Sequence, residues 1–298
     1  MAERPEGIVD GFPLARLTTV GTGGPARFFA RIGSVEALAR CLAWAADEQV
    51  VIRTVGLGSN LLPADAGFDG LVLRLERGLA TTTVAGTVVT CGGGASLAGV
   101  VRKAADAGLA GIEFGCAIPG TVGGAVRMNA GAYGRAVADV LVDATVVAAA
   151  TARTVDGIAL GLRYRGSNVL PGEVVASARL RLTASDAATV RAAIRALQGR
   201  RAAAQPRKVR TFGSVFKNPP GDRTSGQILE QCGLKGLTIG GARISPVHAN
   251  FIENLGSATS ADVVSLIQEA CRRARLHAGV ELEHEVELLG PIAVDPFG

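Results

Sequence analysis

The sequence predicts an α+β fold of about two domains. Strand-like and helix-like segments follow one another without a regular βαβ repeat, which argues against a doubly wound sheet. The 298 residues, 48% of them hydrophobic, are enough for two sizeable cores. Aromatic residues make up only 4%, so these cores are expected to consist mainly of Ala, Val and Leu.

The first half of the chain begins with a clear helix signal. Residues 34–47 have amphipathic spacing, and Ser34 stands at the N-cap position. Residues 50–56 have the composition of a buried strand and lead into a tight turn at 56–62, which lacks the third glycine of a dinucleotide fingerprint. Further strands are expected at 71–75 and 87–91, and a helix at 95–108 that ends at Gly108.

The second half mixes both kinds of element. Strands are expected at 140–149 and 174–182, the latter with one polar face, and a helix at 185–203 capped by Ser185 or Asp186. The polar, basic residues 205–210 have the composition of a domain boundary. Beyond them we expect a helix at 225–232, a strand at 242–252, a helix at 260–277 and a closing strand at 280–290.

Charge and cysteine content exclude several classes of protein. The net charge of +5 comes without Lys/Arg runs interleaved with aromatics, which argues against nucleic-acid binding, but it suits a small anionic ligand such as a diphosphate. The five cysteines form no CxxC pair and are odd in number, which argues against zinc or a disulfide framework and favours a reducing cytoplasm. Neither a signal peptide nor a membrane span is expected, because no long apolar run occurs.

Residues 115–134, GCAIPGTVGGAVRMNAGAYG, are dense in glycine. Each glycine inside a helix costs about 1 kcal/mol relative to alanine, so ordinary secondary structure does not favour such a run. A run of this kind is typical of backbone that passes close to a large ligand and offers N–H groups to phosphate. A glycine-rich surface loop is the alternative on composition alone.

Three shorter clusters place polar side chains beside glycines. They are residues 18–26, 162–167 and 213–219. Binding and catalytic groups concentrate in such loops. Taken singly, each cluster is more typical of an ordinary turn or a solvated charge than of a functional site.

Together, these clusters and the glycine-rich run resemble the UDP-N-acetylenolpyruvoylglucosamine reductase family. The similarity extends from Leu14 to Gly290 and keeps the family's order. It is carried by LTTVGTGGPA, GLGSNLLPADAGFDGLVL, GIEFGCAIPGTVGGAVRMNAGAYG, YRGS, GSVFKNP, GLKGLTIGGARIS, HANFIEN and LEHEVELLG.

The resemblance implies a bipartite FAD-binding domain of the vanillyl-alcohol oxidase (PCMH) type, followed by a C-terminal α+β substrate-binding domain. The expected boundaries are 1–75 and 76–198 for the two flavin-binding subdomains and 199–298 for the last domain, whose final strand returns to the active site. The implied activity is reduction of UDP-N-acetylglucosamine enolpyruvate to UDP-N-acetylmuramate, a cytoplasmic step of peptidoglycan precursor synthesis, with NADPH as reductant.

Three residues match the family's catalytic positions. Arg165 of the YR motif is expected to stabilise the negative charge that develops on the substrate when hydride adds to its terminal carbon. Ser214 is expected to supply the proton, and Glu285 to assist in stabilising the intermediate. Glu281, Glu283 and Glu287 would share a strand face with Glu285, so motif matching alone selects it.

The resemblance also implies ligand contacts. FAD is expected to be held without a covalent bond, because no histidine precedes His248. Substrate contacts are expected from Tyr164, Lys217, Asn218 and His248, the last of which could equally be structural. The expected FAD contacts are Gly56, Gly58, Ser59, Asn60, Leu61, Ile118, Pro119, Gly120, Thr121, Gly123, Gly124, Ala125 and Asn129.

The segment after the YR motif lacks the longer, Tyr-bearing loop of some family members, so the chain resembles the shorter subtype. Cys116 is interpreted as a packing residue. Two other functions are the alternatives. An FAD-dependent oxidoreductase acting on another sugar or alcohol is disfavoured by the small number of histidines, and a nucleotide-sugar binding protein without activity is disfavoured by the intact catalytic and glycine-rich motifs.

Overall fold

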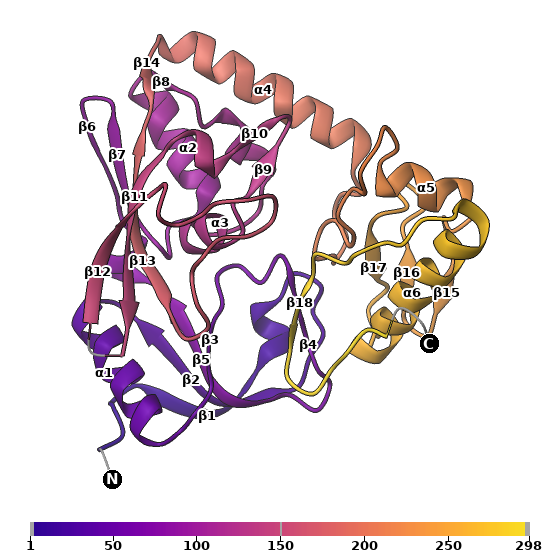
Figure 1. Cartoon of the computed structure of the whole chain (residues 1–298), viewed down its shortest axis with the longest axis horizontal. Coiled ribbons are helices and arrows are strands. Elements are labelled where there is room, and N and C mark those ends of the chain that lie inside the picture. Colours follow the sequence, from indigo (N-terminus) through magenta and orange to yellow (C-terminus); the bar gives the residue numbers. More distant parts are fainter. Residues whose placement is uncertain (1–2, 150, 296–298) are drawn as a thin grey trace. The chain divides into compact units, whose positions relative to one another are not determined.

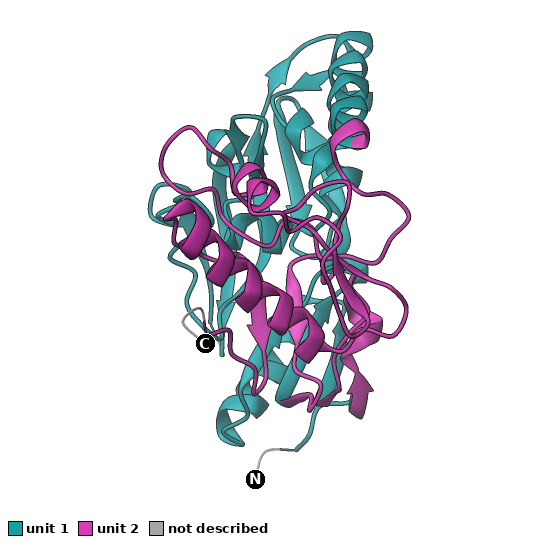
Figure 2. Ribbon diagram, turned by 90° about the vertical axis from the view of Figure 1, so that its right-hand side faces the viewer, with its two compact units in different colours: residues 1–10, 28–57, 69–201 teal, residues 11–27, 58–68, 202–298 magenta. Residues whose placement is uncertain are grey.

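The computed structural model describes residues 3–149 and 151–295, which form two compact units (Figure 2). Each unit is assembled from separate stretches of the chain. The first consists of residues 1–10, 28–57 and 69–201, and the second of residues 11–27, 58–68 and 202–298. The ends of the predicted first and last domains, residues 1–2 and 296–298, lie outside the described residues.

A four-stranded sheet in the order β1-β2-β5-β3 lies mostly in the first unit (Figure 1). Its strands are β1 (Ile8–Pro13), β2 (Pro25–Ile32), β5 (Phe68–Leu75) and β3 (Ile52–Thr54). Helix α1 (Val35–Asp47) is capped as predicted, because Ser34 Oγ accepts a hydrogen bond from the N–H of Ala37 at 3.2 Å. The prediction of a buried strand at 50–56 is wrong, since β3 is an edge strand with Arg53 and Thr54 exposed.

An antiparallel five-stranded sheet in the order β12-β11-β13-β7-β6 completes the first unit. Its strands are β6 (Thr82–Ala85), β7 (Val88–Gly92), β11 (Leu141–Ala148), β12 (Thr151–Asp156) and β13 (Val174–Arg181). Helices α2 (Leu97–Asp106) and α3 (Val122–Arg127) contribute to the same aliphatic core as these strands. The predicted polar face appears in the second half of β13, where Ala178 and Leu180 are buried and Arg179 and Arg181 are exposed.

Helix α4 (Ala187–Ala204) follows the sheet. Asp186 rather than Ser185 caps it, because its carboxylate accepts the N–H of Thr189 at 2.8 Å. Short strands occur at β8 (Leu109–Ala110), β9 (Gly131–Ala132), β10 (Arg135–Ala136) and β14 (Thr183–Ala184). Single 3₁₀ turns occur at Leu14–Leu17, Arg77–Ala80, Glu113–Ala117 and Val137–Asp139.

The second unit packs helices against a small antiparallel sheet, β15-β16-β17. The strands are β15 (Thr238–Ile239), β16 (Ala242–Ile244) and β17 (Ile252–Asn254), and the helices are α5 (Ser225–Gln231) and α6 (Ser260–Arg273), with a π turn at Ala274–Ala278. The prediction of one strand over 242–252 is wrong, because the chain leaves the sheet after Ile244. The buried amide of Asn250 in this loop bonds to both backbone groups of Phe216 at 2.9 Å.

The closing segment is divided between two partners. Residues 283 and 285 bond to the backbone of residues 217 and 215, and only β18 (Glu287–Leu289) is a regular strand. Strand β18 runs parallel to β4 (Leu61–Pro63). The expected strand over 280–290 is therefore extended but changes its partner midway.

Asp65 explains why residues 58–68 belong to the second unit. Its carboxylate accepts the N–H groups of Ser260 at 2.8 Å and Ala261 at 3.0 Å, at the start of α6. Thr259 and Asp262 form a capping box at the same helix end. The predicted division at 75/76 and 198/199 differs from these compact units, and the three-part organisation stays a prediction.

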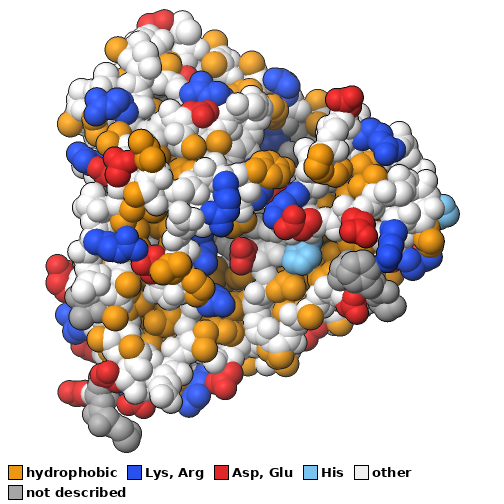
Figure 3. Space-filling model, viewed as in Figure 1, with side chains coloured by type: hydrophobic (Ala, Val, Ile, Leu, Met, Phe, Trp, Pro, Cys, Tyr) orange, Lys and Arg blue, Asp and Glu red, His pale blue; other side chains and the backbone are white. Residues whose placement is uncertain are grey.

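Charged residues of both signs are interspersed with apolar ones on the face shown in Figure 3, so neither sign of charge forms a continuous patch there. Within the described residues, none of the helices has the length and apolar character that crossing a membrane requires.

Glu269 on α6 makes the stability of the second unit dependent on pH. Its hydrogen bond from Arg272, supported by Arg273, lowers the pKa of Glu269 from 4.5 to about 2. Because the folded-state pKa is depressed, this stabilisation is fully present above about pH 4.5 and is lost as the pH falls through about 2. We expect Glu269→Gln to lower stability by about 1 kcal/mol at pH 7.

The measurement is the thermal midpoint of both proteins between pH 7 and pH 2.5. The difference between variant and wild type should shrink on acidification, and a constant difference would contradict this account. Glu230→Gln, which removes the partner of Lys235 at a more exposed pair, is the control and should change the midpoint less.

Candidate active site

Two of the predicted flavin-binding segments meet inside the first unit. Gly56 packs so closely on Thr121 that a Cβ at position 56 would overlap the Thr121 hydroxyl. The residues that follow β3 therefore lie beside the glycine-rich segment 118–125. The structure brings these predicted FAD residues together.

The glycines of α3 allow close packing within the chain. The N–H of Val122 bonds to Ala95 O at 2.9 Å and that of Gly123 to Gly93 O at 2.8 Å, so both groups have partners within the chain, and the expected flavin contact of Gly123 stays a prediction. A Cβ on Gly123 would lie 3.1 Å from Gly93 O. Gly124 is exposed and a Cβ there would find its nearest neighbour at 3.8 Å, which leaves room for a bound group beside the helix.

The remaining predicted flavin residues, Gly58 to Leu61, belong to the second unit. Gly58 has a φ of +62°, and a Cβ there would overlap Leu17 O. Its carbonyl accepts the N–H of Thr19 at 3.1 Å. The first polar cluster, residues 18–26, thus fixes the turn that carries Ser59 and Asn60.

Backbone pairing in the second unit places Glu285 beside Val215, the residue that follows Ser214. The N–H of Glu285 donates to Val215 O at 2.8 Å, and Ser214 is paired with Phe251 on its other side. Glu285 is half-buried, whereas Glu281, Glu283 and Glu287 are exposed. Burial therefore separates Glu285 from its three neighbours, which the alternation of the sequence could not do.

The KNP motif is attached to the start of α5. Asn218 Oδ1 accepts the N–H of Ser225 at 3.1 Å, and the Ser225 hydroxyl donates to Lys217 O. The Lys217 ammonium forms an ion pair with Glu283. These contacts attach Lys217 and Asn218 to the start of α5, directly after the extended segment that contains Ser214.

His248 lies in the same unit with a defined hydrogen-bonding state. Its Nδ1 accepts the N–H of Asn250 at 3.2 Å, which leaves the proton on Nε2. Burial, followed by the nearby Lys235, lowers the pKa of His248 from 6.5, so the imidazole is neutral at neutral pH. The ring packs edge-on to Phe251 and over Gly226, where a Cβ would lie 2.6 Å from His248 Cε1.

The loop of the YR motif is a tight turn in the first unit. Arg163 and Gly166 exchange backbone hydrogen bonds of 3.0 and 3.1 Å, and Arg165 takes a φ of +55°. Arg165 lies over the ring of Tyr164 at 5.0 Å. The buried amide of Asn129 supports this turn from behind, because Nδ2 donates to Arg163 O at 3.2 Å.

Asn129 joins that turn to a second one. Its Oδ1 accepts the N–H of Ala138 at 2.9 Å. Asn129 is an expected FAD contact, but nothing in the sequence indicates this link, since only folding brings residues 129, 138 and 163 together. Its contact with flavin stays a prediction.

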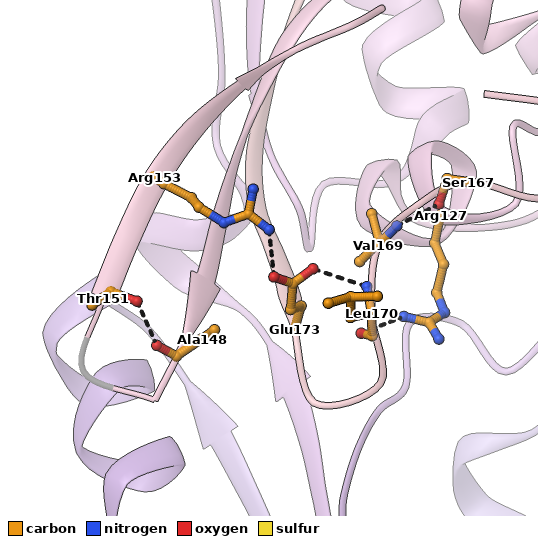
Figure 4. A network of polar contacts seen from close by, with 8 residues as sticks. All are labelled: Arg127, Ala148, Thr151, Arg153, Ser167, Val169, Leu170 and Glu173. Carbon is orange, nitrogen blue, oxygen red and sulfur yellow. Dashed lines mark hydrogen bonds and ion pairs between the residues drawn. The ribbon is translucent and has the colours of Figure 1, made fainter. Parts of the chain in front are cut away.

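Glu173 holds the far end of the same loop (Figure 4). Its carboxylate pairs with Arg153 and accepts the N–H of Leu170 at 2.8 Å, and Leu170 O accepts a bond from Arg127. The pKa of Glu173 is lowered, with burial opposing and the Leu170 and Arg153 bonds favouring the charged form. No motif pointed to Glu173, which the sequence presents as one more polar loop residue.

No group of three or more His, Cys, Asp and Glu side chains suited to a metal occurs among the residues the structure describes. All five cysteines are unpaired thiols. Burial raises the pKa of Cys91 to about 12 and that of Cys271 to about 11. Burial also raises the pKa of Cys116, which packs against the aliphatic core of the five-stranded sheet. Both observations agree with the interpretation of Cys116 as a packing residue.

Comparisons with known proteins agree with this arrangement. Residues 26–157 match the model of an FAD binding domain, and residues 205–289 match the model of the UDP-N-acetylenolpyruvoylglucosamine reductase C-terminal domain. The fold and site thus define a flavoprotein in which an FAD-binding domain is followed by a separate C-terminal domain. The predicted fold class is confirmed, and so is FAD as the cofactor.

Close relatives define the family. The chain is 42% identical to UDP-N-acetylenolpyruvoylglucosamine reductase 2 of Symbiobacterium thermophilum, over 93% of this chain and 91% of the relative. It is 43% identical to the reductase of Rhizorhabdus wittichii, over 95% and 92%. The crystal structure of MurB from Thermus caldophilus matches with a TM-score of 0.82 and 35% identity, over 95% of this chain and 98% of that one. The chain belongs to the UDP-N-acetylenolpyruvoylglucosamine reductase family, as its motifs predicted.

Asn129→Ala should destabilise the first unit by about 1–1.5 kcal/mol, because the N–H of Ala138 loses its partner and the carbonyl of Arg163 loses one of its two hydrogen bonds. The measurement is the chemical denaturation midpoint. Asn168→Ala removes an exposed amide that bonds Arg163 in the same loop and is the control, with an expected loss below about 1 kcal/mol. Equal losses in the two variants would contradict the role given to Asn129.

Proposed function

We propose that the protein is an FAD-dependent reductase that converts UDP-N-acetylglucosamine enolpyruvate to UDP-N-acetylmuramate with NADPH. The observation that supports the proposal is the backbone pairing of Glu285 with Val215, the residue after Ser214, within a chain of this family. The substrate and product place the reaction in peptidoglycan precursor synthesis, and we place it in the cytoplasm.

The reaction saturates one carbon–carbon double bond. Held by its expected contacts, FAD would supply the hydride, taken from NADPH, for the terminal carbon of the enolpyruvyl group. One proton then adds to the neighbouring carbon, so NADPH and one proton are consumed and NADP⁺ is released. The protein has to neutralise the transient negative charge and deliver that proton to one face.

Ser214 is the proposed proton donor. A serine hydroxyl is a weak acid, so it can protonate only a strongly basic centre such as the carbon beside the substrate carboxylate. The hydroxyl lies on an extended segment held on both sides, by Phe251 and by the Glu285 backbone. Glu285 leaves the neighbouring segment and is proposed to assist in stabilising the intermediate.

Arg165 is proposed to bind the substrate carboxylate as charge develops. A guanidinium suits this task because it is always protonated and can bond a carboxylate through two N–H groups. The turn that carries it is fixed by Asn129, and Glu173 fixes the loop beyond it. This support limits the reorganisation needed at the moment of reaction.

The second unit also carries the proposed substrate contacts. Lys217 supplies positive charge, and His248 an Nε2–H donor, for the diphosphate of the UDP group. Asn218 contacts the sugar nucleotide beside them. In the first unit, the exposed Tyr164 adds an aromatic surface.

Ser214→Ala tests the central role. The variant should bind FAD, be yellow and bleach with NADPH at the wild-type rate, because hydride transfer to flavin does not require the proton donor. Reduction of the enolpyruvyl substrate should fall by roughly 10²–10⁴-fold. Anaerobic stopped-flow absorbance of the flavin measures both steps.

Thr211→Ser, three residues upstream and outside the proposed machinery, is the matched control. Unchanged turnover in Ser214→Ala would remove Ser214 from the mechanism. Peroxide formation with simple sugars, without reduction of the UDP substrate, would instead favour an oxidase and contradict the proposed function.

His248 can be tested separately from the chemistry. His248→Gln keeps an N–H donor and should change the KM for the UDP substrate by only a few-fold, whereas His248→Ala should raise KM by about tenfold, the equivalent of 1.4 kcal/mol. Gly226→Ala should also raise KM, because its Cβ displaces the imidazole. Equal KM values in the wild type and His248→Ala would show that the histidine is structural.

A further inference from the structure

Asn60 makes a contact that its place in the flavin-binding motif does not explain. Its side-chain Nδ2 donates to the backbone carbonyl of Glu285 at 2.7 Å. Its own carbonyl accepts the N–H of Glu287 at 2.9 Å. One residue of the flavin turn therefore holds the backbone on both sides of Val286.

The other side of Glu285 is also held. Its N–H donates to Val215 O at 2.8 Å, directly after Ser214. Because peptide groups are planar, fixing the N–H and the carbonyl of one residue leaves little freedom in its φ and ψ. The two hydrogen bonds thus set the direction in which the Glu285 side chain leaves the backbone.

The side-chain amide of Asn60, and not its backbone, binds the carbonyl of Glu285. The strand pairing of β4 with β18 begins only at Leu61 and Glu287 and does not include the carbonyl of Glu285. The Asn60 side chain therefore supplies this hydrogen bond in place of a backbone N–H from a neighbouring strand. A change in the side chain at position 60 can consequently release Glu285 without removing the strand pair.

We propose that Asn60 is a positioning residue that holds Glu285 for the reaction at the enolpyruvyl group. The proposal rests on the proposed function, because it assigns Asn60 to the half-reaction in which Ser214 and Glu285 act. Reduction of the flavin by NADPH uses neither side chain and does not depend on this contact.

Asn60→Asp is the sharpest variant, because it keeps the size of the side chain and the backbone bond to Glu287. At neutral pH a carboxylate accepts hydrogen bonds and cannot donate one, so the bond to Glu285 is lost. Oxidation of the reduced flavin by the UDP substrate should slow by roughly 10- to 100-fold, the usual effect of a misplacement of about 1 Å. Reduction by NADPH should slow less than this step, with both rates taken per bound FAD, because Asn60 is also an expected FAD contact.

The matched control is Asn254→Asp in the same unit. Asn254 Nδ2 donates to Val20 O at 2.8 Å, and its Oδ1 accepts two backbone N–H groups that an aspartate can still bind. This variant loses the same kind of bond away from Glu285. Neither half-reaction should change in it.

A double-mutant cycle with Glu285→Gln tests whether Asn60 acts through Glu285. On that background Asn60→Asp should slow substrate reduction by no more than about twofold, because the positioned group is already disabled. Full additivity of the two effects would overturn the proposal. So would equal slowing of both half-reactions or loss of FAD in proportion to activity, since either outcome makes Asn60 a flavin ligand only.

Amide hydrogen exchange of residues 283–287 in the flavin-loaded protein supplies a readout without turnover. Exchange should be faster in Asn60→Asp and unchanged in Asn254→Asp, and equal exchange in all three proteins would contradict the proposal. If wild type oxidises NADPH but never reduces the UDP substrate, the proposed function itself fails. Wild-type turnover combined with an additive cycle refutes the role of Asn60 alone.

Discussion

The second unit depends on the backbone pairing of its closing segment with two distant parts of the chain. Residues 283 and 285 bond to 217 and 215, and residues 287–289 pair with 61–63. A single extended stretch therefore joins the turn at residues 58–61, which is predicted to bind flavin, to the extended segment that contains Ser214. Because each partner fixes only a few backbone groups, side chains such as the Asn60 amide complete the attachment.

Glycine has two uses in this protein. The glycine-rich run at 115–134 predicted backbone that faces a ligand, and Gly124 has the open space that a bound ligand would need. At Gly56, Gly58 and Gly123 the absent side chain instead makes room for another part of the chain. A rigid surface for flavin needs both kinds of glycine. Backbone can stay close to a ligand only if other segments pack tightly behind that backbone.

Buried amides support both parts of the proposed site. Asn129 joins the turn of Arg165 to the backbone of Ala138, and Asn250 bonds both backbone groups of Phe216 close to Ser214. A buried amide that satisfies two backbone groups stabilises an irregular loop that has no strand ladder of its own. The reacting groups can thus lie on loops and still be held firmly.

The sequence by itself determined the local elements and the family. Capping at Ser34, the helix from 260 onward and the order of the motifs follow from neighbouring residues, so local patterns predict them. Only the tertiary structure decided that 58–68 joins the C-terminal unit, that 242–252 is two strands, and that Glu285 alone of its neighbouring glutamates is half-buried. These features depend on hydrogen bonds between residues far apart in the chain, whose pairing no local periodicity encodes.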